Sequence, residues 1–224
     1  PLWVAQRLSD RPPHLLKRHH RTTFDIAQAL DTWPVNPGRD NFFARLPGNQ
    51  ALKIDLVELT LEIPRLHPAL DQFSILHLSD IHFGHAIRQE FFEEVVRISN
   101  AQEAHLIAIT GDILDEKQCL PWIPETLGKL KAELGVYFIL GNHDWLLHDL
   151  PSIQEAIHAA GHEYLGSNSK TLSFNGQEIV LAGNELPWFQ PAADPTQLPP
   201  RDEDGTPLRL LLAHSPDQFN WARE

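Results

Sequence analysis

The sequence contains no methionine, even at position 1, and only one cysteine, Cys119. A single cysteine excludes an internal disulfide framework and a cysteine-rich zinc module, and it fits a reducing compartment. No apolar run approaches the roughly 18 to 20 residues that a membrane-spanning helix needs. We therefore expect a cytoplasmic protein with no membrane crossing in these 224 residues. Because methionine is common in ordinary proteins, its absence also leads us to expect that residues of the natural chain are missing from the sequence.

Basic side chains are in the minority. The chain has 18 Lys and Arg against 30 Asp and Glu, which gives a formal net charge of -12. This balance argues against a protein that coats nucleic acid, because such proteins neutralise phosphates with Lys and Arg. Hydrophobic residues make up 42% of the chain, enough for a buried core. We therefore expect a globular protein without stable nucleic-acid binding.

The first 21 residues differ in charge from the rest. They carry five basic side chains and one acidic side chain. One interpretation is an arm that contacts an anionic membrane surface peripherally. The other is a solvated basic helix that packs on an acidic domain, and we favour it because five charges over 21 residues form a weak cluster. Membrane association of a cytoplasmic protein thus stays open.

Strand-like and helix-like patterns alternate from residue 53 onward. Strand patterns cover residues 53–63, 73–78, 106–109, 136–140 and 208–213, and a hairpin is expected over 172–182. Helical spacing covers residues 91–98 and 123–134, and Ser152 with Glu155 predicts a capping box for a further helix. This alternation predicts an α/β domain over residues 52–224. Residues 1–51 are expected to form a mostly helical and irregular N-terminal extension.

Polar side chains follow four of the predicted strands. They are Asp80 and His82, then Asp112 and Asp115, then Asn142, His143 and Asp144, and finally His214. Successive groups before His214 are about one strand–helix unit apart, so they should meet at the sheet edge where α/β proteins bind ligands. Carboxylate, amide and imidazole groups suit Mn, Fe, Zn or Mg. Because several unpartnered buried carboxylates would be costly, a metal site is favoured over simple loop caps. A carboxylate that bridges two such ions would hold them about 3.5–4 Å apart, as two-metal phosphoester chemistry requires.

Taken together, these motifs carry a family resemblance. They are Asp80-Ile81-His82, Gly111-Asp112-Ile113-Leu114-Asp115, Gly141-Asn142-His143-Asp144 and the strand-end His214. In this order they resemble the calcineurin-like metallophosphoesterases over residues 52–224. The preceding segment, from Ile63-Pro64-Arg65-Leu66 onward, resembles the small, often membrane-associated bacterial members. The resemblance implies a two-sheet β-sandwich flanked by helices in four layers, and a metal-dependent phosphoric ester hydrolase.

The resemblance also implies a role for each motif residue. Asp80 and His82 would bind one divalent ion, Asn142 and His214 a second, and Asp112 would bridge the two. A hydroxide between the ions would be the nucleophile, with Mn, Fe, Zn and Mg all open as the metal. His143 would act as a general acid on the leaving oxygen, and Asp144 would hold the His143 ring in place. Asp115 would only support its loop.

The family pattern normally continues, after the equivalent of His214, with a Gly-His-x-His segment that adds one ligand to each metal. The sequence ends at Glu224 without it, and we expect this segment in a missing C-terminal part. The substrate stays open among phosphodiesters, phosphomonoesters and lipid-linked pyrophosphates. The alternatives are a non-catalytic scaffold or binding module on the same fold, and a binuclear hydrolase of a non-phosphate ester or amide. The presence of all the motif ligands argues against the scaffold.

Overall fold

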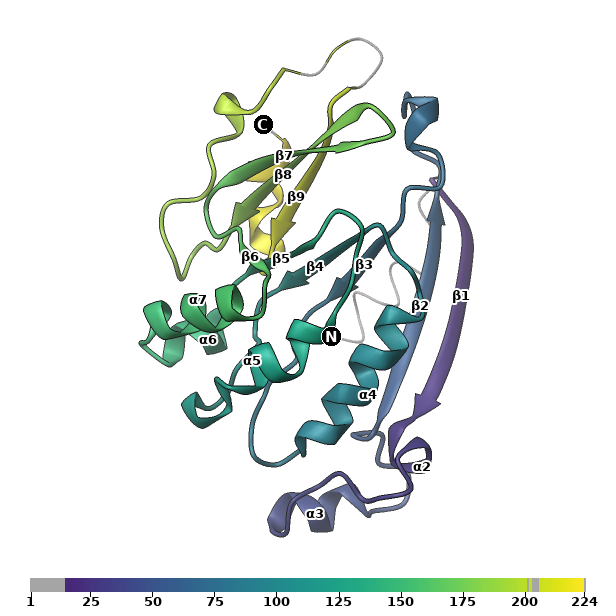
Figure 1. Cartoon of the computed structure of the whole chain (residues 1–224), viewed down its shortest axis with the longest axis vertical. Coiled ribbons are helices and arrows are strands. Elements are labelled where there is room, and N and C mark those ends of the chain that lie inside the picture. Colours follow the sequence, from purple (N-terminus) through teal and green to yellow (C-terminus); the bar gives the residue numbers. More distant parts are fainter. Residues whose placement is uncertain (1–14, 201, 203–205, 224) are drawn as a thin grey trace.

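The computed structural model describes residues 15–200, 202 and 206–223, and its strands form three sheets (Figure 1). Strands β1 (Leu16–Asp25) and β2 (Lys53–Leu61) form an antiparallel ribbon. The parallel sheet contains, in spatial order, β3 (Ile75–Leu78), β4 (Leu106–Thr110), β5 (Val136–Ile139) and β6 (Glu163–Tyr164). The third sheet contains the antiparallel hairpin β7 (Ser169–Phe174) and β8 (Gln177–Asn184), with β9 (Leu208–Ala213) parallel to β8.

Helices connect these strands. They are α2 (Ile26–Ala29), α3 (Arg39–Ala44), α4 (Gln89–Asn100), α5 (Trp122–Glu125), α6 (Asn142–Leu146) and α7 (Leu150–Ala159). Short 3-10 turns lie at Pro68–Leu70, Lys117–Cys119, Leu127–Lys129, Pro195–Gln197, Pro216–Phe219 and Trp221–Arg223. Among the helices of the described residues, none is long and apolar enough to span a bilayer.

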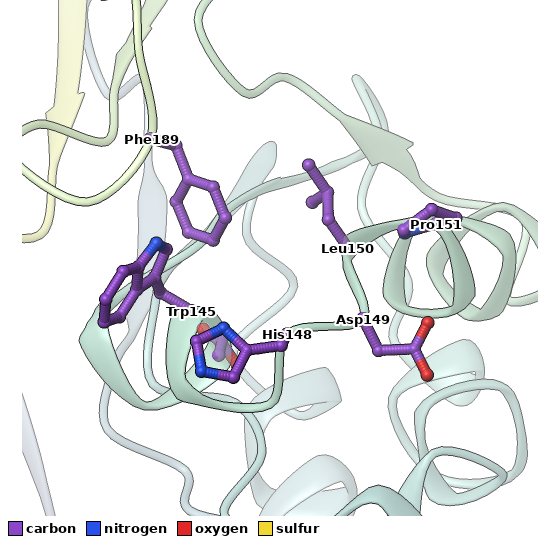
Figure 2. Close-up of a pocket in the computed structure, with 7 residues that line it drawn as sticks. Trp145, His148, Asp149, Leu150, Pro151 and Phe189 are labelled. Carbon is purple, nitrogen blue, oxygen red and sulfur yellow. The ribbon is translucent and has the colours of Figure 1, made fainter.

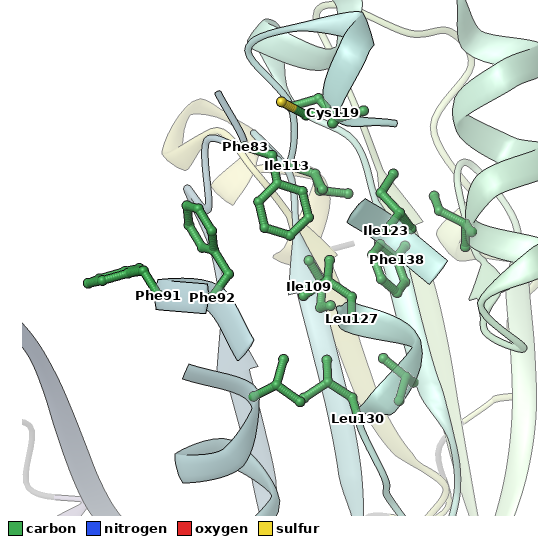
Figure 3. Close-up of a cluster of buried hydrophobic side chains, with 14 of the residues drawn as sticks. Phe83, Phe91, Phe92, Ile109, Ile113, Cys119, Ile123, Leu127, Leu130 and Phe138 are labelled. Atoms are coloured by element: carbon green, nitrogen blue, oxygen red, sulfur yellow. The ribbon is translucent and has the colours of Figure 1, made fainter. Parts of the chain in front are cut away.

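Alternate side chains of the parallel sheet face two different cores, because neighbouring residues of a strand point to opposite faces. Ile109 and Phe138 face the helices, where they pack with Phe92 of α4 and Ile123 of α5 (Figure 3). On the opposite face, Leu106, Tyr137 and Ile139 pack against Ile179 and Leu181 of β8. The two sheets are therefore stacked, with a shared core between them.

The predicted fold class, an α/β two-sheet sandwich flanked by helices, is confirmed. α4, α5 and α7 cover the outer face of the parallel sheet, as their buried residues show. The outer face of the third sheet packs Val180 and Ala182 against Ala193 and Leu198 of the following loop. The short Trp221–Arg223 turn adds Trp221 to this contact.

Residues 16–21 of the basic segment lie in a strand, where a helix was favoured, and residues 1–14 lie outside the described residues. β1 pairs with β2 over nearly its whole length, with Thr22 opposite Leu56 and Phe24 opposite Ile54. Lys17 and Arg21 form ion pairs with Glu62 and Asp55 of the same ribbon. The ladder joins residues on both sides of the expected boundary at residues 51 and 52. Cross-strand pairing thus prevailed over the local helical interpretation.

One local helix prediction was also wrong, and a second predicted helix is present but begins earlier than expected. The apolar spacing over 123–134 predicted one helix, but α5 ends at Glu125 and only a 3-10 turn follows. Pro124 and Gly128 both disfavour a continuous helix here. The helix assigned to the Ser152–Glu155 capping box begins earlier, at Leu150, with Asp149 as its N-cap.

Candidate metal centre

The predicted site residues all lie just beyond the carboxyl ends of parallel strands. The loops after β3 and β4 are joined by the Asp80 N–H to Gly111 carbonyl bond, at 3.1 Å, and the His82 N–H to Asp112 carbonyl bond, at 2.9 Å. Asp80, His82 and Asp112 all have positive φ, between 53° and 56°. A left-handed conformation costs a non-glycine residue roughly 1–2 kcal/mol, and such strain clusters at functional sites.

Asp112 lies at the centre of the group. Its side chain is 5% exposed, and its Oδ1 accepts the backbone N–H of His143 at 2.8 Å. Its Oδ2 lies 3.9 Å from Nε2 of His82 and 3.4 Å from Nε2 of His214. Two groups that could hold an ion share this carboxylate: His82, Asp112 and His143, and Asp80, Asp112 and His214. Asp80 also lies near the first group, because its Oδ1 is 3.9 Å from Nε2 of His82.

The hydrogen bonds of His214 direct its Nε2 towards other possible ligand atoms of the cluster. Nδ1 of His214 lies 2.7 Å from the Thr110 carbonyl, which can only accept, so Nδ1 carries a proton. Nε2 faces Oδ1 of Asn142 at 3.2 Å and Oδ2 of Asp112 at 3.4 Å. With its lone pair on Nε2, the ring would offer a nitrogen ligand beside two oxygen ligands, an arrangement that a cation between them would stabilise. The donor set therefore fits a divalent metal ion.

Asp115 orients two of the histidines, a role that the sequence did not indicate. Its Oδ1 accepts the Nδ1 protons of both His82 and His143 at 2.8 Å, and the two rings meet edge-on with centroids 4.6 Å apart. Nε2 of each ring is thereby left to bind a metal or move a proton. Burial alone would lower the pKa of His82. The hydrogen bond to Asp115 and the nearby carboxylate charges outweigh burial and raise this pKa.

Asp144 has a different structural role from the predicted one. It was expected to hold the His143 ring, but Asp115 makes that contact. Asp144 is 1% exposed and accepts backbone N–H groups from Ile113 and Leu114, at 3.0 Å, and from Gly141, at 2.9 Å. Burial raises the pKa of Asp144 to about 6, although these amide bonds oppose the shift. The carboxylate thus fastens the loop after β4 to the turn after β5.

An open hollow of about 360 Å³ lies beside Asp144. Figure 2 shows Trp145 of α6 and Phe189 on one side of it, with His148 between α6 and α7. Asp149, Leu150 and Pro151 at the start of α7 complete the lining. This hollow brings aromatic surface next to the turn that carries Asn142 and His143.

A second buried carboxylate, Glu185, was not singled out from the sequence. It directly follows β8, is 1% exposed, and accepts the Leu140 N–H at 2.5 Å and the Tyr164 hydroxyl at 2.7 Å. Burial raises the pKa of Glu185 to about 7, with a further contribution from the charge of Asp144. The contacts of Glu185 are visible only in the structure, because an isolated glutamate after a strand has no sequence signature.

The raised pKa of Glu185 predicts that the stability of the protein depends on pH. Unfolded Glu185 titrates near 4.5 and folded Glu185 near 7, so the folded state holds the extra proton between these values. The free energy of unfolding should therefore fall as the pH rises from 5 to 8, by about 2 to 3 kcal/mol from this group. Urea unfolding of metal-free wild type and Glu185→Gln at both pH values measures the difference, with Glu178→Gln of the same strand as the control. Equal pH dependence in wild type and Glu185→Gln would exclude the shift.

Comparison with known proteins agrees with this geometry. Residues 73–223 match the model of the calcineurin-like phosphoesterase family. A zebrafish (Danio rerio) transmembrane protein with metallophosphoesterase domain is 31% identical over 139 residues, which cover 60% of this chain and 32% of that protein.

Two Bacillus subtilis proteins are also similar. The uncharacterized metallophosphoesterase YkoQ is 38% identical over 37% of this chain and 31% of its own length. The uncharacterized metallophosphoesterase YkuE is 28% identical over 73% of this chain and 58% of its own. The chain thus spans about a third of the zebrafish protein and of YkoQ. With its family motifs gathered around Asp112 at one sheet edge, the chain belongs to the calcineurin-like phosphoesterase family.

Proposed function

We propose that the chain is a binuclear phosphoesterase in which Asp112 is shared by two divalent ions. The family supports metal-dependent phosphoester chemistry in general. The observation that carries the finer proposal is the position of Asp112 Oδ2, within 4 Å of Nε2 of both His82 and His214. A carboxylate between two imidazoles with free lone pairs suits a pair of cations.

We assign the residues to two ligand sets around Asp112, a division that differs from the two closest groups, in which His143 lies with His82 and Asp80 with His214. Asp80 and His82 would hold one ion, and Asn142 and His214 the other. When bound, two divalent ions supply an activated water and neutralise charge on the phosphoryl oxygens. Mn, Fe, Zn and Mg all suit these donors, and manganese is the ion we choose for assays.

We assign the general-acid role to His143. Its side chain is 40% exposed, so it can reach a substrate. The carboxylate of Asp115 accepts the Nδ1 proton at 2.8 Å and so orients the ring. Nε2 can then donate its proton to the leaving oxygen. Asp144 takes part indirectly, by fixing the Gly141 turn from which His143 projects.

The proposed substrate is a phosphodiester, a phosphomonoester or a lipid-linked pyrophosphate, all of which the same residues could hydrolyse. Metal-stripped protein should hydrolyse bis(p-nitrophenyl) phosphate only after Mn²⁺ is added. Asp112→Asn should lose at least about 100-fold of this rate, because it removes the shared charge. Asp71→Asn, at an exposed position outside the site, is the matched control.

The alternative of a non-catalytic scaffold gives a different result in this assay. A scaffold would bind Mn²⁺ or nothing, and it would hydrolyse neither phosphodiesters nor phosphomonoesters. A rate that is unaffected by Mn²⁺, or kept in Asp112→Asn, would contradict the proposal. Competitive inhibition by vanadate separates a phosphoesterase from a hydrolase of non-phosphate esters.

A peripheral membrane contact through residues 1–21 is a further proposal, and it assumes the predicted cytoplasmic location. Lys17 and Arg21 are paired with acids of the β1–β2 ribbon, which leaves Arg18 and the charges of residues 1–14 as the source of attraction. Binding to vesicles with anionic lipid should therefore be weak, sensitive to salt and lost when residues 1–14 are deleted. Unchanged binding after this deletion would exclude the contact.

A further inference from the structure

Glu185 joins two sheets at a point next to the metal centre. It lies at the end of β8 in the third sheet, whereas its partners Leu140 and Tyr164 belong to the end of β5 and to β6 of the parallel sheet. Leu140 directly precedes Gly141, where the turn that carries Asn142 and His143 begins. The Leu140 N–H is thus held one residue before the ligand turn.

The backbone of Glu185 also supports the other side of the centre. Its carbonyl accepts the N–H groups of Trp188 and Phe189, both at 3.1 Å, and so closes a tight turn. The Trp188 ring lies against the His214 ring, with centroids 5.4 Å apart. One residue therefore contacts the segments that orient both His143 and His214.

A buried carboxylate costs stability unless its partners compensate, and an apolar side chain would fill the same space at lower cost. Among the described residues, the side chain of Glu185 accepts hydrogen bonds from the Leu140 N–H and the Tyr164 hydroxyl, and burial raises its pKa. The apolar core between the sheets, which includes Ile139 and Leu181, holds them together without Glu185. A supporting role in the adjacent metal centre explains the buried glutamate at position 185.

Building on the proposed function, we propose that Glu185, assisted by Tyr164, is a positioning residue for the metal centre. Its side chain fixes the Leu140 amide, and thereby the turn that carries Asn142 and His143. Its backbone carbonyl fixes the turn that places Trp188 against His214. Glu185 touches neither metal nor substrate. Losing its side chain should shift the turn that carries Asn142 and His143, which weakens metal binding and slows turnover while substrate recognition changes little. The backbone carbonyl that holds the Trp188 turn stays in every substituted protein.

The test compares Glu185→Gln, Glu185→Leu and Tyr164→Phe with wild type. Gln keeps an oxygen that accepts the Leu140 N–H, so its Mn²⁺ affinity should stay within about threefold of wild type. Leucine cannot accept the hydrogen bonds of the Leu140 N–H and the Tyr164 hydroxyl. Glu185→Leu should therefore lose about 10- to 100-fold in Mn²⁺ affinity, the range for groups that orient ligands. With bis(p-nitrophenyl) phosphate, kcat of Glu185→Leu should fall by a similar factor, while KM moves less than about threefold. Glu178→Leu, an exposed glutamate of the same strand, should behave as wild type.

Each outcome decides the inference. A folded Glu185→Leu protein that binds Mn²⁺ as tightly as wild type would overturn the inference, because there would be no loss of affinity for glutamine to restore. If Glu185→Leu does not fold, Tyr164→Phe decides, with an expected threefold to tenfold loss of Mn²⁺ affinity, and unchanged affinity would overturn the inference. If wild type binds Mn²⁺ but does not hydrolyse the diester, the proposed function fails, while the affinities still test Glu185.

Discussion

Replacing Gly141 with alanine is expected to eliminate metal-dependent activity in a protein that still folds. A Cβ at this position would lie 2.3 Å from Oδ1 of Asp112, 2.7 Å from the backbone N of Asp112 and 2.9 Å from Nε2 of His214. The backbone of Gly141 is extended, with φ of -115°, so alanine meets no conformational penalty. The effect is therefore steric, and it falls on the side chain and backbone of Asp112 and on a ligand histidine.

The size of this effect follows from how strictly such sites depend on geometry. A misplacement of about 1 Å can cost on the order of 100-fold in rate, and here at least one ligand must move. Mn²⁺ affinity and hydrolysis of bis(p-nitrophenyl) phosphate measure the loss. Gly84→Ala is the matched control, because a Cβ there meets its nearest neighbours at an ordinary 3.6 Å. A Gly141→Ala protein with wild-type Mn²⁺ affinity would show that the cluster around Asp112 is not the metal site.

Removal of the Asp115 carboxylate is expected to impair both histidines at once. Asp115→Ala deletes the common acceptor of the His82 and His143 Nδ1 protons, so both rings lose their orientation and their fixed tautomer. Loss of a carboxylate behind one ligating histidine costs about 10- to 100-fold in metal affinity or activity, and here two rings depend on it.

The conservative variant separates orientation from charge. Asp115→Asn keeps an oxygen that can accept a ring proton, so it should bind Mn²⁺ better than Asp115→Ala. An amide oxygen accepts a ring proton more weakly than a carboxylate does, so the rate of Asp115→Asn should stay below that of wild type. Asp71→Ala removes an exposed aspartate outside the site and serves as the control. If Asp115→Ala and Asp71→Ala give the same rate and affinity, Asp115 does not orient the site.

The strand-end residues could be predicted because the fold brings them together by a simple rule. In a parallel sheet the carboxyl ends of neighbouring strands lie at one edge, so Asp80, Asp112 and Asn142 become neighbours once the strands are recognised. His214 arrives from the other sheet, where β9 runs parallel to β8. To predict that these residues are neighbours, only the order of the strands is needed, and the periodicity of the sequence reveals that order.

The supporting residues could not be predicted, because their roles depend on distances of a few ångströms. Asp115 and Asp144 are both aspartates in site loops, and only the structure shows that the first contacts the histidine rings and the second the backbone amides. Glu185 is separated by 45 residues from the Leu140 amide that it accepts. β1 illustrates the same limit, since its partner β2 begins 28 residues after β1 ends and no local pattern indicates the pairing.

The central claim is that two divalent ions share Asp112, and a calorimetric titration of metal-stripped protein with Mn²⁺ tests it most directly. We expect two ions per chain in wild type. In Asp112→Asn, which should fold normally, we expect both sites to be lost or weakened by at least about 100-fold, because each ion loses the same negatively charged ligand. Binding of two ions with unchanged affinity in Asp112→Asn, or of a single ion in wild type, would contradict the account.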